Sequence, residues 1–396
     1  MSKLNLLMLN YEFPPIGGGA GKAHLCQLKE YTKTNELKID MLTAAPKPGF
    51  TKEQFSDNIT IYKVGLHKKK LHFWRKIEVL EWLFKARHHY RRLLRENNYD
   101  LAHAFFGFPT AYLCFRTANK LPYIISLRGS DVPGKHARLK LDYKILGPVF
   151  KAIWKKASVL IACSQGLKDR ALQFMPSAAI EVITNGIDLN MFHGVPERDS
   201  SRLGKSRPAQ NHKSRQKLKL LTVGRLSVTK RFEILIDAVE ILHKAGRNLH
   251  LTIAGGGAML NGLKQIVSQK NLTDIIDVKG RIDFDLMPDL YRQNDIFVSA
   301  SMQEGMSNAM LEAMASGLPI ITTRCEGVDE LIADNGIVVE QAAPEAIADE
   351  IKKLADDKTG YELMCKAARK KAEQFGWAHI AEQYLRYYRN IADRYS

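Results

Sequence analysis

The chain has 396 residues, of which 45% are hydrophobic and 26% charged, with a net charge of +17. This composition excludes wholesale disorder, a collagen-like repeat and a small disulfide scaffold, and the length predicts two domains. The longest charge-free stretch, Asn248 to Leu263, contains Thr, Asn and four Gly, so no membrane-spanning helix is expected.

The N-terminal segment Leu4 to Asn10 predicts a buried strand, and the absence of a leader cleavage site predicts a cytoplasmic protein. Three glycines, Gly17, Gly18 and Gly19, follow this strand and precede a helix expected over Ala20 to Tyr31. Their spacing fits neither a P-loop nor a dinucleotide fingerprint. Glycines before a helix let backbone N–H groups approach an anion, although a tight turn alone is the simpler alternative.

Short apolar runs continue to alternate with helical patterns along the first half. Such alternation predicts βαβ units and a parallel sheet with both faces covered. The further strands are expected over Ile39 to Thr43, Leu101 to Ala104, Tyr123 to Leu127, Val159 to Ala162 and Ile180 to Ile183.

The segment Lys63 to Glu96 carries 11 Lys and Arg against three Glu. A helical face is predicted there, lined by Phe73, Ile77, Leu80 and Phe84 and flanked by Trp74 and Trp82. One interpretation is a surface helix with its aromatics in the core, and the other is a patch on anionic lipid headgroups. In a combined form, the apolar stripe faces inward while four cations face lipid, namely Lys68, Lys69, Lys70 and Arg75.

A polar, basic stretch then marks the domain boundary. Residues 1–196 form the first domain with a net charge of +15, 197–217 the basic linker, and 218–377 the second domain. We expect the basic half to meet an anionic partner. Strands of the second domain are expected over Leu218 to Val223, Leu249 to Ala254, Ile275 to Val278, Ile296 to Ala300, Pro319 to Thr323 and Ile337 to Val339.

The second domain opens with a strand that delivers Arg225 to its carboxyl end, and Lys230 lies five residues further on. An Arg fork and a Lys point charge that converge on one point neutralise a diphosphate. Each of these residues alone is more often an ordinary surface cation.

The most informative segment runs from Ser299 to Pro319. A strand ends, a loop carries Glu304, Ser307 caps a helix, and Glu312 lies in its second turn. The N–H groups at the helix start favour an anion, and Glu312 is placed to grip a hydroxyl-bearing ligand. The N–H groups belong to Gly305, Met306, Ser307 and Asn308.

The final segment, residues 378–396, predicts a closing helix. Five cysteines are scattered without a C-x-x-C pair, and no histidine has metal-ligand spacing, so neither a disulfide framework nor a metal site is expected.

Four motifs together resemble the retaining glycosyltransferases of family 4, and the resemblance covers nearly the whole chain. They are the glycine loop 17–19, the segment Ile183-Thr184-Asn185-Gly186-Ile187-Asp188, Gly224-Arg225-Leu226 with Lys230, and the block from Glu304 to Glu312. The resemblance implies the α/β GT-B fold: two Rossmann-like, doubly wound domains facing across a cleft, with residues 378–396 returning to the first. The implied donor is a nucleotide-diphosphate sugar, with no cofactor and no metal.

The resemblance also implies roles for single residues. Arg225 and Lys230 bind the diphosphate, Glu312 the ribose, and Glu304 with the amides of 305–308 the sugar, so Arg225, Lys230 and Glu304 are the catalytic candidates. The glycine loop 17–19 closes over the phosphates, and the base lies near Arg281 and Ile282.

Two positions depart from the family pattern. Arg128 stands where many members have His, in Leu127-Arg128-Gly129-Ser130-Asp131, and Arg231 replaces the usual glycine after Lys230. Arg128, Asp131 and His103 are candidates for acceptor contact, with His103 alternatively a strand-end contact.

The predicted reaction is sugar transfer to a saccharide or lipid-linked acceptor in cell-envelope polysaccharide synthesis, at the inner face of the cytoplasmic membrane. A nucleotide-sugar epimerase or hydrolase on the same fold is the alternative enzyme. A non-enzymatic membrane or nucleic-acid binder is suggested by charge alone, and nucleic acid is not the expected partner because no base-stacking module is present.

Overall fold

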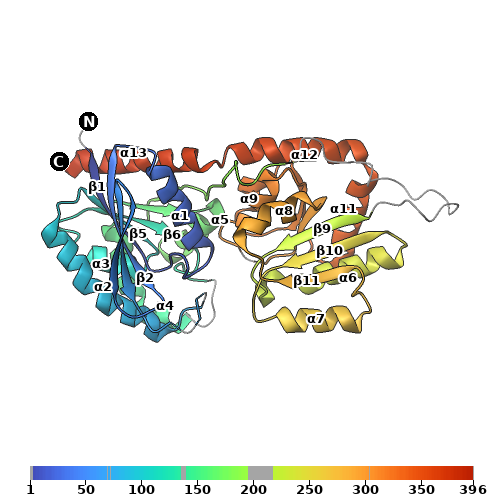
Figure 1. Ribbon diagram of the computed structural model, residues 1–396, viewed down its shortest axis with the longest axis horizontal. Helices are drawn as coiled ribbons and strands as arrows, with labels where there is room; N and C mark the ends of the chain where they lie inside the picture. The colour runs from blue at the N-terminus through green and yellow to red at the C-terminus, as the bar shows by residue number, and fades with distance from the viewer. Residues whose placement is uncertain are drawn as a thin grey trace. The chain divides into compact units, whose positions relative to one another are not determined.

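The computed structural model describes residues 3–68, 70–71, 73–134, 140–194, 217–302 and 304–395. It divides into two compact units, one of residues 1–186 with 377–396 and one of residues 187–376. Each is an α/β unit built on its own sheet (Figure 1). Most of the predicted linker, residues 197–216, lies outside the described residues.

Unit 1 contains an eight-stranded sheet in the order β3-β4-β2-β1-β5-β6-β7-β8. Its strands are β1 (Leu4–Asn10), β2 (Leu37–Ala45), β3 (Phe50–Ser56), β4 (Ile59–Gly65), β5 (Leu101–Phe105), β6 (Tyr123–Leu127), β7 (Val159–Ala162) and β8 (Ile180–Val182). All adjacent pairs are parallel except β3 with β4. The antiparallel hairpin is absent from the sequence prediction because β3 is exposed along most of its length and lacks an apolar alternation.

Helices cover both faces of this sheet (Figure 1). They are α1 (Gly19–Tyr31), α2 (Lys76–Glu96), α3 (Thr110–Phe115), α4 (Lys140–Lys156), α5 (Gln165–Phe174) and α13 (Trp377–Tyr395). On one face, α1 and α13 bury a core with β1, β2 and β5. On the other face, α3 lies between α2 and α4.

The helix α2 is turned opposite to the two interpretations that place its apolar stripe in the core, and its exposed stripe agrees with the third, the patch on a lipid surface. Its core contacts come from Trp82 and Tyr90, which are 0% and 1% exposed, while Phe84 is 80% exposed. The stripe predicted to face inward therefore faces solvent. Lys68, predicted to face lipid, instead has a buried side chain that donates to Glu78 at 3.2 Å and lies 3.7 Å from the Trp74 ring centroid. Lys69 lies outside the described residues.

Unit 2 contains a six-stranded parallel sheet in the order β11-β10-β9-β12-β13-β14. Its strands are β9 (Leu218–Val223), β10 (Leu249–Ala254), β11 (Ile276–Gly280), β12 (Ile296–Ser299), β13 (Ile320–Thr323) and β14 (Gly336–Val339). Its helices are α6 (Phe232–Lys244), α7 (Leu260–Gln269), α8 (Met287–Arg292), α9 (Asn308–Ala315), α10 (Val328–Leu331), α11 (Pro344–Asp356) and α12 (Lys358–Glu373), with 3-10 turns η3 (Val228–Lys230) and η4 (Phe284–Leu286). The order is that of a Rossmann fold.

Candidate active site

The sheet of unit 2 reverses its strand order between β9 and β12. Strands β10 and β11 lie on one side of β9, and β13 and β14 lie beyond β12. In open parallel sheets, ligands bind at the carboxyl ends of the strands where the order reverses. The residues that follow β9 and β12 are the ones that the sequence singled out for a diphosphate and a sugar.

Two loops meet at this point. Lys230, at the end of η3, forms an ion pair with Glu304, which follows β12, and both side chains are mostly buried. The Met302 amide donates to the Thr229 carbonyl at 2.9 Å, so the backbones are joined as well. Arg225 lies two residues beyond β9 and is exposed. The structure thus brings Lys230 and Glu304 into contact and leaves the Arg225 guanidinium open to solvent.

Arg231 links these loops to a third strand. Its backbone is left-handed, with φ 48° and ψ 46°, a conformation that glycine adopts without steric cost. Its Nε donates to the Ala300 carbonyl at 2.7 Å, and a terminal nitrogen lies 3.4 Å from Thr323 Oγ1 at the end of β13. These two hydrogen bonds link the ends of β12 and β13, and their stabilisation offsets the free-energy cost of the left-handed backbone at Arg231.

The helix α9 begins as the sequence predicts. Ser307 is its N-cap, with Oγ accepting from the Met310 amide at 3.4 Å. Met306 and Ser307 are buried, and Gly305 and Asn308 are half-buried. Glu312, in the second turn, accepts a 2.8 Å hydrogen bond from the fully buried Tyr291 hydroxyl of α8. That hydroxyl fixes one carboxylate oxygen of Glu312.

Glycines pack the loop after β10 against the loop after β9. A Cβ at Gly255 would lie 1.8 Å from the Gly224 carbonyl oxygen, and one at Gly257 would lie 2.2 Å from that of Leu226. Only glycine permits this close approach of the two loop backbones.

Arg281 and Ile282 directly follow β11, and Arg281 is exposed while Ile282 is half-buried.

A thiol lies beside the charged pair. The pKa of Cys325 is raised to about 12 by burial and by the negative charge of Glu304. At neutral pH the thiol is protonated, so it is a poor nucleophile.

In unit 1, the glycine loop forms the start of α1. Gly17 has φ 89°, Gly18 is the N-cap and Gly19 is the first helical residue. A Cβ at Gly17 would lie 2.7 Å from Glu12 Cβ, so the first glycine is required by backbone packing. Gly18 is half-buried and Gly19 exposed, which leaves the helix start accessible from solvent.

Arg128 follows β6 and is held on three sides. Its guanidinium lies 4.5 Å from the Phe105 ring centroid, donates to Asn185 Oδ1 at 2.8 Å, and lies 3.3 Å from the Tyr384 hydroxyl. Asp131 accepts from the Gly107 and Arg128 amides at 2.7 and 2.8 Å, so its carboxylate secures two loops. Burial raises the pKa of Asp131, and these amide hydrogen bonds oppose that effect.

His103 is 0% exposed and presents no atom to an acceptor in this structure. Its Nδ1 lies 2.8 Å from the Tyr388 hydroxyl of α13, and its Nε2 lies 2.8 Å from Ser126 Oγ. The pKa of His103 is held well below its usual value by burial and by the positive charge of Arg128. His103 therefore acts here as a neutral strand contact.

Sequence reasoning did not assign roles to Tyr291, Thr323 or Gly255–257. The glycine run directly after a strand is a signal that was available. The contacts of Tyr291 and Thr323 depend on tertiary packing and leave no local pattern. Among the described residues, no cluster of three His, Cys, Asp or Glu side chains is arranged as metal ligands. Within the same ranges, each helix is too short or too polar to cross a bilayer.

Comparison with known proteins agrees with this architecture. Residues 18–191 match the family described as Glycosyltransferase Family 4, and residues 205–374 match Glycosyl transferases group 1. An uncharacterized glycosyltransferase of Methanocaldococcus jannaschii is 25% identical in an alignment of 404 positions that covers 98% of each chain. A D-inositol 3-phosphate glycosyltransferase of Paenarthrobacter aurescens is 30% identical over 53% of this chain and 51% of its own.

Solved structures share the fold. Sucrose-phosphate synthase from Thermosynechococcus elongatus superposes with a TM-score of 0.80 at 21% identity, over 98% of this chain and 99% of its own. Anabaena HepE in complex with UDP-glucose has a TM-score of 0.71 at 18% identity, over 97% and 99%. The chain is a sugar-transferring enzyme that belongs to the family 4 glycosyltransferases of the GT-B fold.

Proposed function

We propose that the chain transfers a sugar, with retention of anomeric configuration, from a nucleotide-diphosphate sugar to a saccharide or lipid-linked acceptor. The observation that carries this proposal is the ion pair between Lys230 and Glu304 at the strand-order reversal, with Arg225 open to solvent beside β9. The complex of HepE with UDP-glucose supports a nucleotide-sugar donor on this fold.

The proposed chemistry depends on charge at the leaving group. As the bond from sugar to phosphate breaks, negative charge grows on the diphosphate, and cations that are already in place stabilise it. Arg225 supplies a planar fork and Lys230 a point charge, while the N–H groups at the start of α9 add partial positive charge. These groups act without a metal ion in our proposal, and Glu304 holds the Lys230 ammonium at the ends of β9 and β12.

Glu312 is proposed to accept hydrogen bonds from the donor ribose. Tyr291 occupies one of its carboxylate oxygens, which orients the group. The proposed same-face mechanism lets the departing diphosphate take the acceptor proton. The assignments of Gly17–Gly19 to the phosphates and of Arg281 and Ile282 to the base stay predictions from the family resemblance.

The acceptor is proposed to be an anionic or lipid-linked saccharide of the cell envelope, used at a membrane surface. The basic charge of residues 1–196 supports this proposal. A relative also supports it: a GDP-mannose-dependent alpha-(1-6)-phosphatidylinositol dimannoside mannosyltransferase of Mycobacterium tuberculosis is 29% identical over 57% of this chain.

Titration with UDP, GDP and ADP by calorimetry identifies the base and tests the site. We expect one of the three nucleotides to bind.

Steady-state kinetics of sugar transfer tests the two cations. Arg225→Ala and Lys230→Ala should each lower kcat/KM by on the order of 100-fold to 1000-fold, because each variant loses a group that stabilises charge in the transition state. Lys264→Ala, an exposed lysine on α7, is the matched control. Near-normal transfer in both site variants contradicts the proposal, and conversion of the donor without any acceptor identifies an epimerase or hydrolase instead.

A further inference from the structure

The exposed face of α2 is divided along its length. Three large apolar side chains occupy its first half, with Ile77 63%, Leu80 54% and Phe84 80% exposed. Residues spaced by three or four positions share a helical face. The same face therefore continues, in the second half, as Arg87, Arg91 and Arg95.

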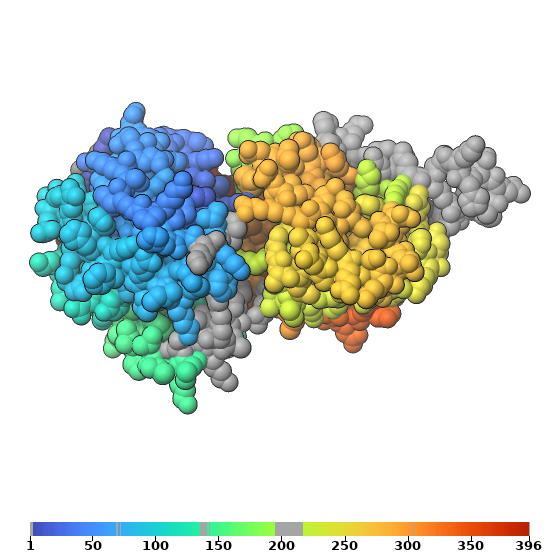
Figure 2. Space-filling model, turned by 60° about the horizontal axis from the view of Figure 1, so that its bottom comes forward, coloured from blue at the N-terminus to red at the C-terminus, as the bar shows by residue number. Residues whose placement is uncertain are grey.

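The helix α4 repeats this order. Its first half exposes Leu141, Ile145 and Leu146, at 65, 65 and 41%, with the exposed Lys144 among them, and Val149 just past the middle is 40% exposed. Its second half carries Lys151, Lys155 and Lys156. Because α2 and α4 both follow carboxyl ends of parallel strands, their apolar halves lie at the same edge of the unit 1 sheet. Both helices belong to the layer that Figure 2 turns towards the reader.

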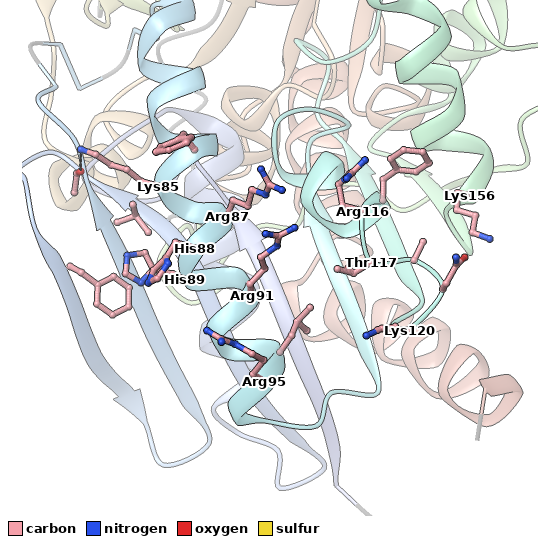
Figure 3. A pocket seen from close by; sticks show the side chains of 18 of the residues that line it. Lys85, Arg87, His88, His89, Arg91, Arg95, Arg116, Thr117, Lys120 and Lys156 are labelled. Atoms are coloured by element: carbon pink, nitrogen blue, oxygen red, sulfur yellow. Dashed lines mark hydrogen bonds between the residues drawn. The ribbon is translucent and has the colours of Figure 1, made fainter.

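A cationic depression lies beside the arginine half of α2 (Figure 3). It measures about 1440 Å³, and seven Lys and Arg but no Asp or Glu line it. At its side, a cavity of about 150 Å³ opens between α2 and α3. Arg87 and Arg91 of α2 and Arg116 at the end of α3 line this cavity together with Tyr112.

These arginines are available to an anion. No carboxylate among residues 3–68, 70–71, 73–134, 140–194, 217–302 and 304–395 pairs with Arg87, Arg91 or Arg116. A cavity needs only about 10–15 Å³ of this kind to hold a water, so 150 Å³ has room for a phosphate group. Three guanidinium forks around one cavity suit the tetrahedral oxygens of a phosphate.

One occupant explains both halves of the surface. A soluble polyanion would use the cations but leave the apolar side chains in water, and an apolar protein partner would leave the cations unneutralised. An anionic bilayer accommodates both, because apolar side chains enter the interface while Lys and Arg meet lipid phosphates.

We propose that the outer surface of α2, α3 and α4 is a docking surface for an anionic phospholipid bilayer. The apolar halves of α2 and α4 enter the lipid interface, and Arg87, Arg91 and Arg116 bind headgroup phosphates. Arg128 also lies at the carboxyl edge of the sheet, so docking directs the candidate acceptor-contacting edge of unit 1 towards lipid. This inference deepens the membrane part of the proposed function and is tested without donor or acceptor.

The experiment is co-sedimentation of the full chain with vesicles of phosphatidylcholine alone, or of phosphatidylcholine and phosphatidylglycerol in equal amounts. We expect binding to the mixed vesicles only, and weakening by salt. The combined variant Arg87→Gln/Arg91→Gln/Arg116→Gln should bind on the order of 100-fold more weakly, since each cation near an anionic surface contributes about a fivefold gain. Leu80→Ser/Phe84→Ser should weaken binding at least tenfold.

Matched changes in unit 2 provide the controls. Lys352→Gln/Lys366→Gln/Lys370→Gln removes the same charge from exposed positions, and Leu286→Ser/Leu363→Ser removes side chains that are 58% and 62% exposed. Both controls should bind as the unchanged chain does. A chain whose binding depends on the arginines but not on Leu80 and Phe84 carries a polyanion surface, and this overturns the proposal.

A second measurement covers the case in which the serine variant fails to fold. Phe84→Trp keeps a large aromatic at an exposed position, and its added emission should shift to shorter wavelength when mixed vesicles are present. An unshifted emission, or no vesicle binding by the unchanged chain, refutes the docking surface. Sugar transfer to a soluble acceptor would persist in either case, so the two failures are distinguishable.

Discussion

At the scale of single residues, Arg231 shows how a departure from the family pattern is accommodated. The sequence shows that glycine is replaced there, and the structure adds the reason that glycine is usual, since φ is 48°. A local pattern could not reveal the compensation, because the Ala300 carbonyl and Thr323 are 69 and 92 positions away.

Substitutions at Arg231 should separate the cost of its left-handed backbone from the stabilisation by its side-chain hydrogen bonds. Arg231→Ala keeps the left-handed cost and loses both hydrogen bonds, so we expect it to lower the free energy of unfolding of unit 2 by about 1–3 kcal/mol. Arg231→Gly loses the same bonds but relieves the backbone, and its loss should be smaller by about 1 kcal/mol. Urea denaturation followed by far-UV circular dichroism measures both, and an alanine variant as stable as the glycine variant would refute the backbone argument.

Two buried histidines make unit 1 sensitive to acid. The pKa of His24 and that of His103 lie well below the usual value because both are buried, and the positive charge of Arg128 lowers them further. The folded chain keeps both rings neutral, whereas the unfolded chain protonates them below about pH 6.5. Above about pH 6.5 neither state binds these protons, so the free energy of unfolding is unaffected. As the pH falls below that value, the unfolded chain takes up protons that the folded chain does not, and the free energy of unfolding decreases.

We expect the free energy of unfolding to decrease below pH 6.5 by up to about 1.4 kcal/mol per pH unit for each ring. Intrinsic fluorescence isolates the effect, because all four tryptophans belong to unit 1. His103→Gln should remove one ring's share of the slope, while His379→Gln, at an exposed position of α13, should leave it unchanged. An unaltered slope in His103→Gln would show that other groups govern the acid transition.

At the scale of elements, the start of α2 is stabilised by a buried ion pair. Glu78 accepts from the Arg75 amide at 2.9 Å and from Lys68 at 3.2 Å. Burial raises the pKa of Glu78, but these hydrogen bonds outweigh it and the net pKa is lowered. The buried ammonium of Lys68 depends on this carboxylate for its charge partner.

Removing that charge should destabilise unit 1. We expect Glu78→Gln to lower the free energy of unfolding by about 3–5 kcal/mol, because a buried cation loses its partner. Glu96→Gln, at the other end of α2 in an exposed pair with Arg92, should change it by less than about 0.5 kcal/mol. Tryptophan fluorescence in urea compares the two, and equal losses would show that the buried pair has no special weight.

The same helix shows how far a sequence pattern reaches. Helical spacing predicted that Ile77, Leu80 and Phe84 share a face, and they do, but they face solvent. The spacing cannot decide between two apolar faces of one helix, since that choice depends on which one fits the sheet. Trp82 is on the face that is buried, and its ring packs near that of Tyr11, with ring centroids 6.1 Å apart.

At the scale of the whole molecule, the two Rossmann-like units were predictable because buried parallel strands are continuous apolar runs that alternate with helices. The placement of Arg225 and Glu304 after the carboxyl ends of β9 and β12 was predictable because both strands are short apolar runs in the sequence, and their role in donor binding stays a prediction. The hairpin of β3 and β4 was not, since its outer strand buries almost nothing. Nor were the side-chain links between loops, such as Tyr291 with Glu312, because no local periodicity encodes them.

The helix α13 carries the last residues of the chain, yet it covers the face of the sheet that contains the first strand. On that face, the Tyr388 hydroxyl of α13 lies 2.8 Å from His103 Nδ1 and 3.4 Å from the Tyr31 hydroxyl. During synthesis, the ribosome releases unit 2 before it releases this helix. Unit 1 therefore waits, with the part of its core that α13 buries still open to water, until this helix has been made, and β1 is among the earliest strands made yet one of the last to be fully packed.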